Sequence, residues 1–211
     1  AQMSAEAFIQ TLLVKGLNVK YLVVGDDFRF GCERKGDFAL LQEAGKKYGF
    51  QVVNMHTFAI DQNRVSSTRI RNALSTGDLV LAEKLLGRPY RMSGRVAHGD
   101  KRGRKMGFPT ANIHLHRHKI PLTGVFAVQL FGIDEEPVNG VANIGIRPTI
   151  GGNKALLEVH LFDFKREIYG EHVQVFFLHK IRDEQRFDGL EQLIAQIHLD
   201  AEQARQYFSQ V

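Results

Sequence analysis

The sequence predicts an α/β domain followed by an antiparallel β-barrel that a C-terminal helix closes. Helical and extended segments alternate in the first half, apolar residues alternate with period two in the second half, and a helical pattern returns after Phe187. All five prolines lie at or after Pro89, and eight of the nine histidines follow residue 90. Composition therefore changes near Gly87, and we divide the chain into domains of residues 1–87 and 88–211.

Capping residues and turn glycines delimit four helices in the first half, and short apolar runs indicate strands at 21–24 and 51–58. The expected helices run from Ser4 to about Leu17, from Asp37 to Gly49, from Ser66 or Ser67 onward, and from Asp78 to Gly87. Such alternation favours a parallel sheet. Because this half opens with a helix and has no initiator methionine, we expect a fragment that lacks an upstream strand and loop.

Three runs in the second half, 125–130, 157–162 and 173–178, alternate with period two and are separated by turn residues at a spacing typical of a barrel. From Phe187 to Phe208 the pattern becomes helical. Its apolar stripe consists of Leu190, Leu193, Ile194, Ile197 and Ala201.

Composition limits the functional class. No apolar run approaches the roughly eighteen residues of a membrane span. A single cysteine, Cys32, excludes an internal disulfide and is typical of a cytoplasmic protein. The net charge is +5, yet residues 91–119 hold eight Lys or Arg against one acid, Asp100. A patch this localised favours one anionic small molecule over a nucleic-acid or membrane partner.

The segment from Gly94 to Asn112 holds four glycines and five cationic side chains and ends in Pro-Thr-Ala-Asn. Glycines allow the backbone to approach an anion, which lysine or arginine neutralises. Thr110 and Asn112 carry oxygen ligands that Mg²⁺ accepts, and on a strand they would face the same side. Neither a P-loop nor a GxGxxG motif is present. The pattern predicts a polyphosphate–magnesium site, and the alternative is a solvated turn capped by the same two side chains.

Glu158 lies on a predicted strand whose other face is Leu157 and Val159. On a cleft face it could act as a general base toward a hydroxyl, whereas on a solvent face it would have no role, and the pattern leaves both open. Arg147 could pair with a phosphate or with a surface acid.

Three further segments carry weaker signals. Residues 25–31 follow a strand at the edge where α/β sheets bind ligands. Residues 66–71 open a helix that could seat a phosphate, although a plain N-cap explains the same residues. His114, His116 and His118 could hold a metal, but an exposed hairpin is the better interpretation because no acid or cysteine completes the ligand set.

Together these segments resemble the bacterial bifunctional riboflavin kinase/FAD synthetase family. The matching strings span residues 24–31, 66–71, 86–89, 103–112, 142–149 and 157–160. The resemblance implies that residues 88–211 form a six-stranded riboflavin kinase barrel and that residues 1–87 are the rear part of a Rossmann-like FMN adenylyltransferase domain. It also implies that ATP phosphorylates riboflavin to FMN, with Thr110 and Asn112 binding Mg²⁺ and Glu158 acting as general base.

We expect nucleotide and flavin contacts from both domains. In the kinase part they are Gly94, His98, Gly99, Lys101, Gly103, Arg104, Gly107, Phe108, Pro109, Thr110, Asn112, Arg147, Arg182 and Phe187. In the adenylyltransferase part they are Asp27, Ser66, Ser67, Thr68 and Arg71.

The sequence departs from the family at its front, where the Gly/His-rich phosphate loop is missing. We therefore expect this chain to phosphorylate riboflavin but not to adenylylate FMN. Two alternatives remain. A nucleic-acid-binding barrel would interleave aromatic residues with the cations, but Phe108 is the one such residue, besides histidines, between positions 91 and 119. A non-catalytic flavin-binding module would bind riboflavin without ATP turnover.

Overall fold

The computed structural model describes residues 2–25, 27–55, 58–99, 103, 107–115, 120–149 and 152–210. It divides into two units, residues 1–65 and residues 66–211, and each is described by itself.

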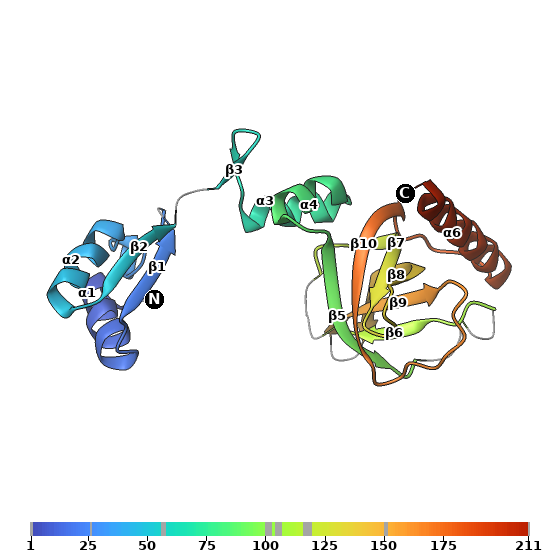
Figure 1. Ribbon diagram of the computed structural model, residues 1–211, viewed down its shortest axis with the longest axis horizontal. Helices are drawn as coiled ribbons and strands as arrows, with labels where there is room; N and C mark the ends of the chain where they lie inside the picture. Colours follow the sequence, from blue (N-terminus) through green and yellow to red (C-terminus); the bar gives the residue numbers. More distant parts are fainter. Residues whose placement is uncertain are drawn as a thin grey trace. The chain divides into compact units, whose positions relative to one another are not determined.

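The first unit packs helices against one face of a two-stranded parallel sheet, β1 (Tyr21–Gly25) and β2 (Gln51–Met55) (Figure 1). Its helices are α1 (Ala5–Phe8), the π-helix η1 (Ile9–Gly16), the short 3₁₀-helix η2 (Cys32–Arg34) and α2 (Phe38–Tyr48). The apolar core of this unit includes Ile9, Leu13, Val24, Leu41 and Phe50. The parallel pairing confirms the predicted α/β character.

Three of the predicted helix caps in the chain are confirmed by hydrogen bonds. Ser4 Oγ accepts from the Ala7 N–H (3.1 Å), Asp37 Oδ1 from Leu40 (3.0 Å) and Asp78 Oδ1 from Leu81 (2.9 Å). The second strand was expected to reach residue 58, but the structure gives β2 as Gln51–Met55, and residue 58 is not part of a strand. A hairpin that the sequence did not predict follows, β3 (Ala59–Ile60) and β4 (Asn63–Arg64).

The second unit contains a closed antiparallel barrel of six strands in the order β10-β5-β6-β9-β8-β7. The strands are β5 (Tyr90–Ala97), β6 (Ala111–His114), β7 (Gly124–Phe131), β8 (Val138–Thr149), β9 (Gly152–Leu161) and β10 (His172–Arg182). The three predicted alternating runs fall in β7, β9 and β10, and their inward residues fill the barrel. The six-stranded barrel is therefore confirmed.

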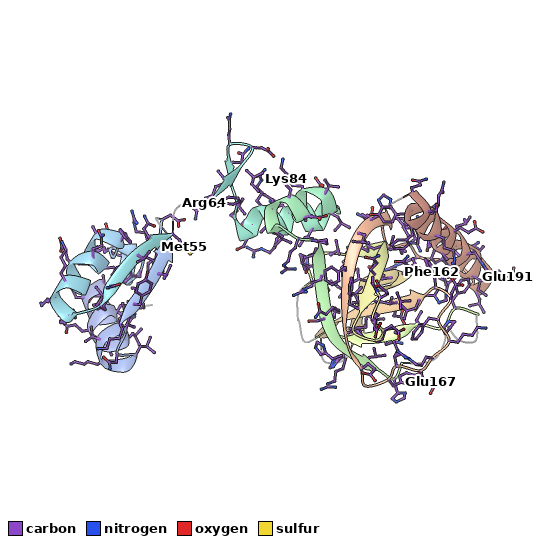
Figure 2. All side chains as sticks on the ribbon, viewed as in Figure 1. Met55, Arg64, Lys84, Phe162, Glu167 and Glu191 are labelled. Atoms are coloured by element: carbon purple, nitrogen blue, oxygen red, sulfur yellow. The ribbon has the colours of Figure 1, made fainter. Side chains whose placement is uncertain are left out.

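Helix α6 (Leu190–Gln210) covers the outside of the barrel, as expected of the C-terminal helical pattern. Ala204, Tyr207 and Phe208 of α6 pack with Val125 and Phe162 on the outer barrel wall. Phe162, labelled in Figure 2, lies in this layer. Helix α6 therefore covers this part of the outer barrel wall and shields it from solvent.

Two more helices, α3 (Ser67–Thr76) and α4 (Leu79–Leu86), belong to the barrel unit. Ala73, Leu74, Leu79 and Ala82 share one apolar core with the barrel interior. The structure therefore divides between residues 65 and 66, whereas composition changes near residue 87. Within the described residues, no helix has the length and hydropathy to cross a membrane.

Candidate active site

A cavity of about 620 Å³ lies against the outer wall of the barrel, with residues of β6, β8 and β9 on one side and residues 182–187 and α6 on the other. This volume lies in the range of small-molecule sites. Nine of the residues expected to bind or react line it: His98, Gly99, Gly103, Phe108, Thr110, Asn112, Glu158, Arg182 and Phe187.

Glu158 forms the centre of a row of polar residues across three strands. It lies directly opposite Asn112 on β6 and opposite Asn143 on β8, so the three side chains share one face of the sheet. Its neighbours Leu157 and Val159 are fully buried inside the barrel. Glu158 therefore points away from the core, and it nevertheless lines the cavity because α6 covers this part of the wall.

The turn before Thr110 is fixed by contacts to the barrel and to α6. Phe108 is buried, and its N–H donates to the Gly103 carbonyl (2.9 Å). The Phe108 ring packs edge-on against His160 of β9 and His198 of α6, with ring centroids 5.2 and 4.6 Å apart. Thr110 and Asn112 line the same cavity, although Thr110 precedes β6 and does not share a strand with Asn112.

Two glycines in this segment allow close approach. A Cβ on Gly99 would overlap the Asn112 amide, and a Cβ on Gly103 would overlap the Phe108 carbonyl. Gly94 serves strand packing instead, since a Cβ there would overlap the His114 carbonyl on the neighbouring strand. The residues that line the cavity do not include Gly94, Gly107 or Pro109. Lys101 and Arg104 lie outside the described residues.

Arg182 reaches the cavity from the end of β10 and is held by Asp200 of α6. Its Nε and Nη2 donate to the two Asp200 carboxylate oxygens at 2.8 and 2.7 Å, and Gln196 also donates to Asp200 (2.9 Å). The guanidinium lies 5.7 Å from the ring centroid of Phe187. Asp200, a buried acid on the apolar face of α6 three residues after Ile197, was not among the residues expected from the sequence.

Models of two protein families match the chain: riboflavin kinase over residues 86–208 and FAD synthetase over residues 1–69. The bifunctional riboflavin kinase/FMN adenylyltransferase of Escherichia coli K12 is 53% identical over 208 residues, which cover 99% of this chain and 66% of that protein. The Haemophilus influenzae enzyme of the same name is 53% identical over 209 residues, covering 99% and 68%. This chain belongs to the bifunctional riboflavin kinase/FMN adenylyltransferase family.

The chain spans about two thirds of the length of these curated relatives. A solved structure from Streptococcus pneumoniae, named a macrolide-efflux protein, is also similar. It is 36% identical with a TM-score of 0.73, and the match covers 97% of this chain and 66% of that one.

The riboflavin kinase match contains the whole cavity, whereas the predicted adenylyltransferase residues lie elsewhere. Asp27, in the first unit, is exposed and pairs with Arg64 at 2.6 Å. The hydrogen bond from Arg64 lowers the pKa of Asp27 below its ordinary value.

The remaining candidates of that domain lie at the start of α3 in the second unit. Ser66 Oγ accepts from the Arg69 N–H (3.2 Å), which is the plain N-cap geometry. Ser67, Thr68 and Arg71 are exposed there.

Arg147 and the histidines at positions 114, 116 and 118 were also candidates from the sequence. Arg147 belongs to β8 opposite Lys154, and its side chain lies outside what the structure describes. His116 and His118 also lie outside the described residues, and the described part of the chain holds no cluster of three or more His, Cys, Asp or Glu suited to a metal ion.

Proposed function

We propose that residues 88–211 transfer the γ-phosphoryl group of ATP to the ribityl 5′-hydroxyl of riboflavin and form FMN and ADP, and that residues 1–87 are part of the FMN adenylyltransferase domain. The observation that supports the kinase proposal most is the row of Asn112, Glu158 and Asn143 on the wall of one cavity. Membership of the riboflavin kinase family selects the reaction among those that a carboxylate beside neutral oxygen ligands could perform.

The residues present fit an ATP–Mg²⁺ complex. Thr110 contributes a hydroxyl and Asn112 an amide oxygen, both hard neutral ligands, next to the Glu158 carboxylate. Because Gly99 and Gly103 have no side chains, their backbone can lie close to Thr110 and Asn112. When bound, Mg²⁺ would offset negative charge on the transferred phosphoryl group.

Glu158 would accept the proton of the riboflavin 5′-hydroxyl. As the 5′-oxygen forms its bond to the γ-phosphorus, the bond to the β,γ-bridging oxygen breaks and ADP leaves with that electron pair. Little covalent chemistry is required of the protein, so positioning and charge neutralisation carry the catalysis. We place the flavin ring against Phe187, Leu193 and Ile197, the apolar residues that line the cavity on the side of α6.

The test is a chromatographic separation of flavins after the chain is incubated with riboflavin, ATP and MgCl₂. FMN should form only when all three are present, and EDTA should suppress it. Without FMN, the kinase proposal fails, and riboflavin binding without ATP turnover would instead indicate a binding module. The same chromatogram tests the expectation that this chain makes no FAD, which a FAD peak would contradict.

A further inference from the structure

His160 lies two residues after Glu158 on β9 and therefore on the same face of that strand. Its Nδ1 is 2.9 Å from the carbonyl oxygen of Pro109, the residue before Thr110. A carbonyl only accepts hydrogen bonds, so Nδ1 carries the hydrogen and donates it, which fixes the ring as the Nδ1–H tautomer when it is neutral.

This side-chain hydrogen bond lies where the backbone pairing of β6 with β9 stops. The register pairs Ala111 with Val159 and Asn112 with Glu158, and Pro109 precedes it with no N–H to donate. The His160 side chain thus connects β9 to Pro109, which precedes Ala111, the first paired residue of β6. Thr110 lies between that connection and the ladder, and is held at both ends.

Aromatic contacts fix the direction of the His160 ring. It packs edge-on against Phe108 and Phe162, with centroids 5.2 and 5.9 Å away. Phe108 is itself held by His198 of α6. The ring therefore has neighbours just after β9 and in the turn whose carbonyl it binds, and the turn itself contacts α6.

We propose that His160 is a positioning residue that sets the Thr110 hydroxyl in register with Asn112 and Glu158 for binding of ATP–Mg²⁺. This inference rests on the proposed kinase function. His160 acts through the Pro109 carbonyl. Loss of the hydrogen bond should raise KM for ATP–Mg²⁺ and lower kcat while leaving riboflavin binding unchanged.

The test compares three variants at position 160, one without a hydrogen-bond donor and two that place a donor at different distances from the backbone. His160→Phe keeps an aromatic ring against Phe108 and Phe162 but cannot donate. His160→Asn places an amide N–H near the position of Nδ1, whereas His160→Gln places it one methylene further out. We expect the Phe and Gln variants to raise KM for ATP–Mg²⁺ about 2- to 10-fold, as for one net hydrogen bond, and the Asn variant to stay within about 2-fold of wild type.

The matched control is His179, an exposed β10 histidine whose ring stacks on Tyr207 (5.0 Å). His179→Phe and His179→Asn should leave both kinetic constants unchanged. Riboflavin binding, measured by the quenching of flavin fluorescence, checks that each variant folds. If His160→Phe fails to fold, the Asn and Gln pair decides the question.

Wild-type KM and kcat in His160→Gln, or equal losses in the Asn and Gln variants, would overturn the positioning role. ¹⁵N NMR of the imidazole gives a readout independent of activity, because the role requires the Nδ1–H tautomer. A wild-type chain that binds riboflavin but makes no FMN, with that tautomer present, would instead refute the proposed function and leave the hydrogen bond established.

Discussion

Glu158 on β9 lies directly opposite Asn112 on β6, and both side chains line the same cavity. The barrel core enforces this pairing, because Leu157 and Val159 on either side of Glu158 are fully buried. A slip of one residue would exchange the faces and move the carboxylate into the apolar interior. Packing inside the barrel thereby sets the geometry of polar groups outside it.

Glu158→Gln should lower kcat for FMN formation by about 10²- to 10⁴-fold, because the amide retains the shape of the side chain but cannot accept the proton. Riboflavin and ATP binding should remain within a few-fold of wild type. Steady-state kinetics with separate binding titrations measure both effects. Glu202→Gln, at an exposed position on α6, is the control. An unchanged kcat would exclude Glu158 as the general base.

Gly99→Ala should raise KM for ATP–Mg²⁺, because the new Cβ would overlap the Asn112 amide and displace it. Gly189→Ala is the matched control, since a Cβ there meets no atom within 4 Å. Titration of the FMN-forming rate against MgCl₂ measures the effect, and the Gly99 variant should require more metal. Equal magnesium dependence in the two variants would argue against Asn112 as a metal ligand.

The sequence predicted helix starts well, because a helix start depends on one capping residue. The caps at Ser4, Asp37 and Asp78 depend on a single side chain and the N–H three residues later, so they can be predicted without tertiary information. Strands β7, β9 and β10 were found from their alternation. β6 was not assigned in advance because four residues are too few to establish a period.

Features that depend on which element packs against a given face could not be predicted from the sequence. The alternation around Glu158 indicates an outward face, but only the covering helix α6 makes that face part of a cavity. The apolar faces of α3 and α4 indicate burial without naming the partner, and the structure places Leu74 and Ala82 against the barrel. Asp200 interrupts an apolar stripe of α6. Its hydrogen-bond partner, Arg182, lies eighteen residues away in the sequence, so the stripe alone does not explain why an acid is buried there.

Asp200→Asn should destabilise the barrel unit by about 3–5 kcal/mol, because Arg182 would remain largely buried without its charged partner. Urea unfolding followed by far-UV circular dichroism measures the change, and Asp188→Asn at an exposed position is the control. The double variant Arg182→Met, Asp200→Leu should recover most of the loss, since it leaves neither charge unpaired. Additive losses in the double variant would contradict this explanation.

Leu74→Ala should weaken the barrel even though α3 precedes it in the sequence. Leu74 is 2% exposed in the core that the helices share with the strands. Removing its side chain should cost about 2–5 kcal/mol. Hydrogen exchange of β5 and β10 amides should accelerate accordingly. Val80→Ala, at a position that is 80% exposed, should change little. Unchanged protection of those strands in Leu74→Ala would show that the helices are not part of the barrel unit.

The pair formed by Asp163 and Arg205 should make a stability contribution that depends on pH. Arg205 donates to both Asp163 oxygens at 2.9 and 3.3 Å, and its guanidinium carbon lies 4.2 Å from the ring centroid of Phe162. The hydrogen bonds and charge of Arg205 lower the pKa of Asp163. Because the folded pKa lies below the unfolded value of about 3.9, the contribution is complete above that pH and is lost as the pH falls through the folded pKa.

Asp163→Asn should therefore lower the thermal unfolding midpoint at pH 7, and the difference from wild type should shrink as the pH falls from about 5 toward 3. Both side chains are largely exposed, so the effect should be small and should decrease in high salt. Glu202→Gln, at an exposed position on α6, provides the control for the loss of one negative charge. A difference that stays constant down to pH 3 would mean that Asp163 acts through packing and not through its charge.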